Sequence, residues 1–143
     1  MPKLDDKPVQ DERQQIAALP YRAHKGFEVL ILTSRETRRW IIPKGWPIKG
    51  KTLALSAARE AYEEAGVIGT ISEKPIGDYH YHKRKKNGAT QLCRVSVYPM
   101  LVLEQRRNWP EKKQRITRWV ALKEASQLVH EPELQALILN FKL

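Results

Sequence analysis

The sequence is poor in cysteine, and its histidines are few. Cys93 is the only cysteine among 143 residues, so no internal disulfide can form, and the four histidines lack the spacing of a zinc site. These absences exclude a small domain that depends on disulfides or zinc for its fold. We therefore expect Cys93 to be a core residue of a protein in a reducing, cytoplasmic compartment.

The sequence also has no hydrophobic run that approaches the length of a membrane span. Residues 1–13 are polar and carry charges of both signs, unlike a secretion signal. We expect these residues to be a flexible lead-in and residues 14–143 to form a single domain, which is long enough to bury a hydrophobic core. We expect no membrane partner, and the sequence leaves a monomer and a homodimer both open.

Positive charge, by contrast, is in excess. The 26 lysines and arginines outnumber the 16 acidic residues and give a net charge of +10 at pH 7. Such an excess raises the local concentration of polyanions around a protein. Nucleic acids and small polyphosphates both fit this property, and charge alone does not choose between them.

Hydrophobic patterns predict short strands interleaved with helices. Residues 27–32 are almost continuously apolar, as in a strand buried on both faces, whereas residues 93–98 alternate, as in a half-exposed strand. Asn87 and Gly88 are a strong turn signal between two strands. Strands are expected at residues 14–21, 27–33, 40–42, 76–82, 92–103 and 118–121, and helices at residues 52–65, 123–129 and 131–141. This order indicates a layered α/β domain.

The helix expected at residues 52–65 has clear boundaries and an acidic face. Thr52 can cap its start, and Gly66 stands where a left-handed residue commonly ends a helix. At about 100° per residue, Glu60, Glu63 and Glu64 fall on one face. The buried stripe is expected to consist of Leu53, Ala57, Ala58, Ala61, Tyr62 and Ala65.

The three carboxylates on this face would repel one another unless a cation lay between them. Together they offer the oxygen ligands that a hard divalent cation prefers. Arg59 lies one turn before Glu63 and can pair with it. Acidic helix faces are common on solvated surfaces, so the helix alone does not establish a metal site.

The loop that precedes this helix makes the pattern specific. Pro43, Lys44 and Gly45 form a turn that leads into the helix. The stretch resembles the Nudix signature G-x₅-E-x₇-R-E-U-x-E-E-x-G-U, in which U is a bulky apolar residue. The positions that match it are Gly45, Arg59, Glu60, Glu63, Glu64, Gly66 and Val67.

The resemblance implies the Nudix fold, an α/β/α sandwich with a mixed β-sheet. It also implies that the protein is an enzyme that hydrolyses a phosphoanhydride bond with Mg²⁺, or alternatively Mn²⁺, as its cofactor. By the same resemblance Glu60, Glu63 and Glu64 would hold the metal, and the main-chain carbonyl of Lys44 would be a further ligand. Water would attack phosphorus and pass its proton to Glu60 or Glu64, and Arg59 would assist.

Two further carboxylates and two departures from the signature complete this expectation. Glu104 and Glu111 lie near the end of a late strand, where some relatives supply another base or ligand. Lys51 stands where the signature has its first Glu, and Ala61 stands where a larger apolar residue is usual. Lys51 adds positive charge beside the site, which could weaken metal binding or contact a substrate phosphate.

Basic residues outside the signature are candidate phosphate ligands. Lysine presents a point charge to a phosphate, and arginine can bind two of its oxygens at once. Such residues also keep exposed edges soluble, which is their commoner role. The candidates are Arg22, Arg38, Arg39, Lys44 and Lys49, together with Lys83, Arg84, Lys85 and Lys86 around the turn at residues 87–88.

The wider pattern resembles the diphosphoinositol polyphosphate and diadenosine polyphosphate hydrolases of the Nudix family. This resemblance rests on residues 40–46 and on Trp109, Pro110 and the segment that follows them. We therefore expect a polyphosphorylated small molecule as the substrate, and the sequence does not rank the two classes. Removal of pyrophosphate from RNA 5′ ends is an enzymatic alternative. A weakly active or non-catalytic module that binds nucleic acid or a phosphorylated ligand is the alternative that Lys51 favours.

Overall fold

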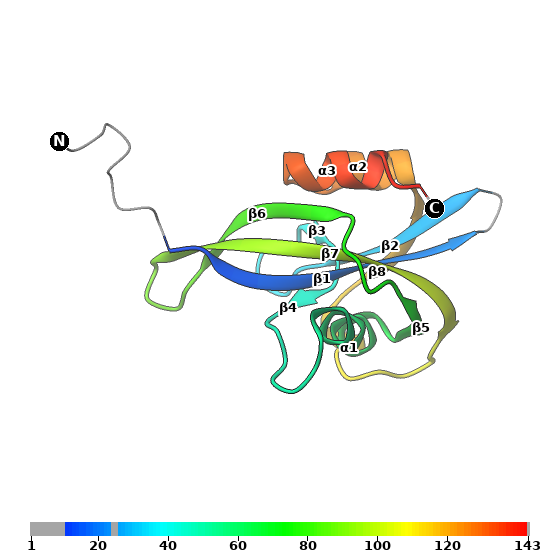
Figure 1. Cartoon of the computed structure of the whole chain (residues 1–143), viewed down its shortest axis with the longest axis horizontal. Helices are drawn as coiled ribbons and strands as arrows, with labels where there is room; N and C mark the ends of the chain where they lie inside the picture. The colour runs from blue at the N-terminus through cyan, green and yellow to red at the C-terminus, as the bar shows by residue number, and fades with distance from the viewer. Residues whose placement is uncertain (1–10, 24–25, 143) are drawn as a thin grey trace.

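The computed structural model describes residues 11–23 and 26–142. A mixed β-sheet separates α1 from α2 and α3, which lie on the opposite face (Figure 1). This is the α/β/α sandwich expected from the sequence. Most of the predicted lead-in, residues 1–10, lies outside the described residues. The elements are β1 (Arg13–Ala23), β2 (Phe27–Thr33), β3 (Trp40–Ile41), β4 (Lys44–Gly45), α1 (Leu53–Ala65), β5 (Val67–Ile71), β6 (Gly77–Arg84), β7 (Thr90–Gln105), a short 3₁₀ turn (Lys112–Gln114), β8 (Thr117–Ala121), α2 (Leu122–Leu128) and α3 (Pro132–Leu139).

The centre of the sheet is the parallel pair of β1 and β7, from the Arg13–Cys93 pair to the Tyr21–Leu101 pair. The other pairs of strands in the described residues are antiparallel. Residues 95–100 of β7 are buried on both faces. The expectation of a half-exposed strand is therefore wrong beyond Arg94, because α1 covers the face on which Tyr98 lies.

The hairpin of β6 and β7 is confirmed, and its turn lies at the expected place. Gly88 has a φ of +84°, which a residue without a Cβ adopts freely. The sequence patterns miss two short strands. One is β4, which falls within the loop expected before the helix at residues 52–65. The other is β5, which pairs with the end of β7. Strands this short carry too little periodicity to be recognised.

Both ends of α1 are capped as the sequence predicts. The Thr52 hydroxyl accepts a hydrogen bond from the Leu55 amide at 3.1 Å. Gly66 adopts a left-handed φ of 71°, and its amide donates to the carbonyl of Tyr62 at 2.9 Å. These bonds satisfy backbone groups that the helix itself leaves unpaired.

The buried stripe of α1 differs from the prediction at its first turn. Leu53 is 38% exposed, whereas Ser56 is fully buried. The Ser56 hydroxyl accepts a hydrogen bond from the Ile48 amide at 2.9 Å, which ties the loop before α1 to the helix. The buried Ser56 hydroxyl thus satisfies a loop amide, which a leucine side chain could not do.

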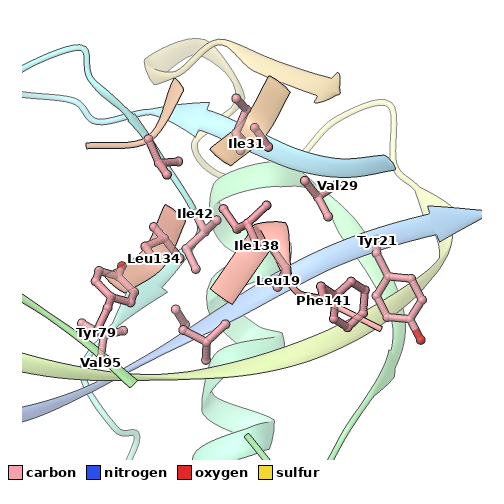
Figure 2. Close-up of a cluster of buried hydrophobic side chains, with 14 of the residues drawn as sticks. Leu19, Tyr21, Val29, Ile31, Ile42, Tyr79, Val95, Leu134, Ile138 and Phe141 are labelled. Carbon is pink, nitrogen blue, oxygen red and sulfur yellow. The ribbon is translucent and has the colours of Figure 1, made fainter. Parts of the chain in front are cut away.

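Two hydrophobic clusters fill the spaces on either side of the sheet. Alternate residues of β1 face opposite ways: Ile16 packs toward α1, and Leu19 packs toward α2 and α3. Figure 2 shows Leu19 with Ile138 of α3 and Tyr79 of β6 in the second cluster. None of the described helices has the length and apolar character needed to cross a membrane.

One polar contact joins α3 to the free edge of β6. Glu133 accepts a hydrogen bond from the His80 amide at 2.8 Å, and its carboxylate lies 3.1 Å from the His80 ring nitrogen Nδ1. On the other side of the ring, Nε2 lies 3.3 Å from the Glu12 carboxylate. The hydrogen bond to Glu133 is the main cause that raises the pKa of His80 above its usual value.

We predict that this contact makes stability depend on pH. A histidine whose pKa is raised in the folded state stabilises the fold fully below its unfolded pKa, and the contribution is lost as pH rises through the folded pKa. The free energy of unfolding of the wild type, measured with urea, should therefore fall between pH 5 and pH 8. The fall should be smaller in His80→Gln. Parallel pH profiles for the two proteins would contradict the assignment.

Candidate active site

The approach of the β4 chain to α1 fixes the position of Glu60. Gly45 pairs with Ile16 of β1, which directs its backbone toward the helix. A Cβ atom on Gly45 would lie 2.5 Å from both Cδ and Oε1 of Glu60. Only glycine leaves room for the Glu60 carboxylate in this position. The glycine of the signature is therefore explained by steric contact, and no positive φ is involved.

Glu64 is the most deeply placed acidic residue of this region, with 4% of its surface exposed. Its nearest cationic partner is Arg115, whose guanidinium lies 3.7 Å from Oε1. That distance is too long for a hydrogen bond, and Oε1 is buried without any hydrogen-bond partner. Burial raises the pKa of Glu64 to about 8, although Arg115 opposes the shift. An orphan carboxylate oxygen of this kind requires an explanation.

Glu60 lies beside Glu64 and shares its electrostatic environment. Burial is the main cause that raises the pKa of Glu60, and repulsion from Glu63 adds to it. The negative charge of Glu60 in turn contributes to the raised pKa of Glu64. Two adjacent carboxylates that both resist ionisation are the electrostatic signature of a place for a cation.

Glu63 does not join these two carboxylates. It accepts a hydrogen bond from Arg59 at 3.0 Å, in the ion pair expected from their spacing. Within residues 11–23 and 26–142, no three acidic, histidine or cysteine side chains are grouped closely enough to hold a metal ion as they stand. The structure thus brings together Glu60 and Glu64 but turns Glu63 toward Arg59. The three-carboxylate metal site remains a prediction.

Arg115 is the residue of this region that the sequence did not single out as a site residue. It is almost fully buried, and it pairs with Glu111 at 2.9 Å. Its guanidinium also donates to the carbonyl of Thr33 at 3.2 Å. Of the two candidate extra carboxylates, Glu111 therefore lies next to Glu64, whereas Glu104 is exposed and pairs with Arg106. Sequence spacing could not show this, because Arg115 lies on a loop far from α1 in the chain.

Trp109 fastens that loop to the end of α1. Its indole nitrogen donates to the carbonyl of Glu64 at 3.1 Å, and its ring lies where a Cβ on Gly66 would be 2.3 Å away. The Glu111 amide donates to the carbonyl of Glu63 at 3.0 Å. Trp109 is therefore a packing residue, and it holds Glu111 and the helix in a fixed relation.

Lys44 points to the face of the sheet opposite α1. Its backbone pairs with Ala17, and its ammonium lies 4.9 Å from the centre of the Tyr81 ring. Burial lowers the pKa of Lys44, and the negative charges of Glu64 and Glu131 oppose this shift. The ammonium makes no hydrogen bond or ion pair with any described residue, and its role as a phosphate ligand stays a prediction. Its predicted role as a carbonyl ligand of the metal is untested.

The other candidate phosphate ligands are dispersed. Arg22 pairs with Glu28 at 2.9 Å and stacks on Trp119, which gives it a structural partner on each side. Arg38 donates weakly to the carbonyl of Gln114, and Arg39 is exposed in the same loop between β2 and β3. Of these, Arg38 alone has a positive φ.

The basic hairpin lies on the Lys44 side of the molecule. Lys83 and Arg84 end β6, and Lys85 and Lys86 are exposed in the turn that follows. Lys83 is close enough to lower the pKa of Lys44 by repulsion. Two further lysines, Lys49 and Lys51, are exposed in the loop before α1. Lys51 has no ion pair among the described residues, so it does not neutralise either buried carboxylate.

Comparisons with known proteins agree with this geometry. The profile of the NUDIX domain family matches residues 11–141. The chain is 32% identical over 118 residues to Nudix hydrolase 12, mitochondrial, from Arabidopsis thaliana, a match that covers 80% of this chain. It is 27% identical over 136 residues to diphosphoinositol polyphosphate phosphohydrolase 3-beta from Bos taurus, which covers 92% of this chain and 79% of that protein.

A solved structure shares the fold. The C. elegans Ap4A hydrolase in a binary complex superposes with a TM-score of 0.64 at 22% identity, over 88% of this chain and 92% of the hydrolase. This likeness supports the architecture of the sandwich. The chain spans 58% of the length of the Arabidopsis relative named above.

We predict that Glu64 destabilises the protein in the absence of a divalent cation. Because its pKa is raised to about 8, the free energy of unfolding should fall as pH rises from its unfolded pKa toward 8. In EDTA, Glu64→Gln should gain stability over the wild type by on the order of 4 kcal/mol at pH 8 and by much less at pH 5. Chemical denaturation at both pH values measures this difference, and an equal effect at both would contradict it.

Proposed function

Because the chain belongs to the Nudix family, we propose that it is an enzyme that hydrolyses a phosphoanhydride bond in a polyphosphorylated small molecule. The proposed cofactor is Mg²⁺, with Mn²⁺ as an alternative ion. The observation that carries this proposal is the pair formed by half-buried Glu60 and buried Glu64. Both carboxylates are held at a raised pKa, and one oxygen of Glu64 has no partner in the fold.

The residues around this pair fit a divalent cation. Hard cations prefer carboxylate oxygens, and a cation would relieve both the repulsion between Glu60 and Glu64 and the missing contact at Glu64 Oε1. Glu63 could join them if its side chain left Arg59, with which it forms an exposed ion pair of small stabilising value. When bound, Mg²⁺ would offset the charge of the phosphates and polarise the bond to be cut.

The side chains of the protein then have distinct roles in this proposal. With a cation bound, Glu60 and Glu64 would be ionised, and one of them would accept the proton of the attacking water, since a carboxylate in poorly solvated surroundings is a stronger base than a solvated one. Arg115 keeps Glu64 in place, and Arg59 keeps Glu63 in place. Lys44 supplies a cation for a phosphate group as its charge redistributes.

Two substrate classes are supported by relatives. The Bos taurus relative is named as a diphosphoinositol polyphosphate phosphohydrolase, and the C. elegans structure is titled as an Ap4A hydrolase. Both substrates carry a phosphoanhydride bond flanked by further phosphates. The net charge of +10 and the exposed lysines of the hairpin suit either class. We propose action on one of these two classes, in a cytoplasmic protein that is a monomer or a homodimer.

Lys51 favours a second candidate function. It replaces the first Glu of the signature, and its exposed ammonium adds positive charge to the loop before α1. A non-catalytic module that binds nucleic acid or a phosphorylated ligand would tolerate this change. Removal of pyrophosphate from RNA 5′ ends is a third candidate, to which the same positive charge is suited. The pair of Glu60 and Glu64 favours catalysis, because repelling carboxylates in poorly solvated surroundings are costly to retain in a module that only binds anions.

We predict Mg²⁺-dependent cleavage of one substrate class. Diadenosine polyphosphates, a diphosphoinositol polyphosphate, 5′-triphosphorylated RNA and nucleoside triphosphates would be incubated with the protein, and the products separated by anion exchange. Glu64→Gln should lower turnover by at least about a hundredfold while the fold survives, and EDTA should abolish it. Full turnover by Glu64→Gln would sink the assignment. Binding without cleavage, with a steep dependence on salt, would support the non-catalytic module.

We also predict that Gly45→Ala acts only through Glu60. The new Cβ displaces the far end of a flexible side chain, so the melting temperature without metal should stay close to that of the wild type. The rise in melting temperature that Mg²⁺ produces should be largely lost. In a Glu60→Ala background the same substitution should cause no further loss, which a double-mutant cycle measures. Additive losses would show that Gly45 matters for another reason.

A further inference from the structure

Glu131 is a second acidic residue whose buried oxygen has no partner. It precedes α3, but its side chain does not cap that helix. Its Oε1 is buried without a hydrogen bond, and no cation lies within ion-pair distance of it in the described residues. Leaving a buried carboxylate oxygen unpaired costs stability. Within residues 11–23 and 26–142, Glu64 Oε1 is the other side-chain oxygen in this condition, and it lies in the proposed active site.

Glu131 lies at the start of α3, beside the strand over which Lys44 lies. Glu133 of the same helix accepts a hydrogen bond from the His80 amide of β6 at 2.8 Å, and the Lys44 ammonium lies 4.9 Å from the centre of the Tyr81 ring. The charge of Glu131 reaches Lys44, Tyr79 and Tyr81, since it affects the pKa of each of them. Tyr81 and Arg13 both lie opposite Cys93 in the sheet, so their side chains share one face. Lys44 lies over the Tyr81 ring on that face. A buried acceptor without a partner and a half-buried cation thus lie on one face of the sheet, near Gly45, which adjoins Glu60.

These two groups complement a ligand that is only partly anionic. Lys44 would bind a phosphate oxygen, whereas Glu131 repels phosphate oxygens and suits a group that donates a hydrogen bond, such as a hydroxyl or an amino group. Aromatic rings also lie near Lys44. Tyr81 is half-buried, and Trp46 is 38% exposed with Arg13 stacked 5.0 Å from its ring centre. A nucleoside joined to phosphates combines a flat ring with donor groups and negative charge.

A uniformly anionic ligand does not fit the same surface. A diphosphoinositol polyphosphate would place several phosphates around Lys44, and the Glu131 carboxylate would repel them. It would also leave Glu131 Oε1 without a donor, so that desolvation of the carboxylate would remain uncompensated. Repulsion of the wrong ligand is a common source of specificity.

We propose that Glu131 is a specificity-determining residue that accepts a hydrogen bond from the nucleoside part of the substrate. The proposal rests on the proposed function and narrows it to dinucleoside polyphosphates. Glu131 acts in recognition and takes no part in proton transfer. Lys44, on the same face, holds a phosphate of the same substrate.

The test compares kcat/KM for diadenosine tetraphosphate and for a diphosphoinositol polyphosphate in four proteins with Mg²⁺. These are the wild type, Glu131→Ala, Glu131→Gln and the control Glu73→Ala. Glu73 is an exposed loop carboxylate without an ion pair in the described residues. Circular dichroism would verify that each variant folds. Binding of diadenosine tetraphosphate in EDTA would be followed in parallel by tryptophan fluorescence.

The wild type should prefer diadenosine tetraphosphate. Glu131→Ala should reduce that preference at least about tenfold, because a hydrogen bond to a charged acceptor contributes on the order of 1.5–3 kcal/mol. Glu131→Gln should retain part of it, since the amide oxygen still accepts, and Glu73→Ala should retain all of it. Binding in EDTA should weaken in Glu131→Ala to a similar extent.

Two results would overturn the proposal while leaving the proposed function intact. One is a wild type that prefers the diphosphoinositol polyphosphate. The other is an equal loss for both substrates in Glu131→Ala, which would show that Glu131 only supports Lys44. If the wild type cleaves neither substrate, the proposed function fails, and the fluorescence titration then tests the role of Glu131 in binding. Weaker binding by Glu131→Ala would then support the role of Glu131, and equal binding would overturn it.

Discussion

The contact between Gly45 and Glu60 is the constraint on which the proposed active site depends. β4 is only two residues long, yet its pairing with β1 brings a glycine backbone to the surface of α1. The space that the missing side chain leaves is filled by the Glu60 carboxylate. This in turn confines Glu60 to a position beside Glu64, where two negative charges must share a poorly solvated space. The acidic pair therefore follows from backbone packing as much as from the spacing of the glutamates along α1.

That arrangement is stabilised from the opposite side by the loop between β7 and β8. Trp109 and Glu111 bond to the carbonyls of Glu64 and Glu63, the last turn of α1, and Arg115 approaches the buried carboxylate from the same loop. Arg115 is thus the one basic residue of this loop that pairs with Glu64, and the negative charges of Glu60 and Glu111 lie close by. Residual repulsion is compatible with a folded protein because the hydrophobic clusters on both faces of the sheet provide the larger stabilising contribution. In the proposed function, the stability lost at this point is the cost of a place for a cation.

The sequence predicts the layers of the fold and the acidic helix because both rest on local patterns. Alternation and continuous apolar runs identify the long strands, and Thr52 and Gly66 mark the ends of α1 by capping chemistry. What it could not predict depends on contacts between distant segments. Leu53 is exposed and Ser56 is buried because a loop amide needs an acceptor, and Arg115 reaches Glu64 only after the chain has folded. No sequence pattern marks Glu131 as a site residue, since an unpaired oxygen can be recognised only when its surroundings in the fold are known.

The two faces of the sheet are packed by separate hydrophobic clusters, and each cluster carries one part of the proposed chemistry. Glu60 and Glu64 belong to the helix on one face, whereas Glu131 stands at the start of the helix on the other. Substitutions in the segment between α2 and α3 can therefore accumulate without disturbing the packing of α1. Lineages that descend from one such protein could diverge in the molecules they recognise while the machinery that breaks the bond is inherited intact.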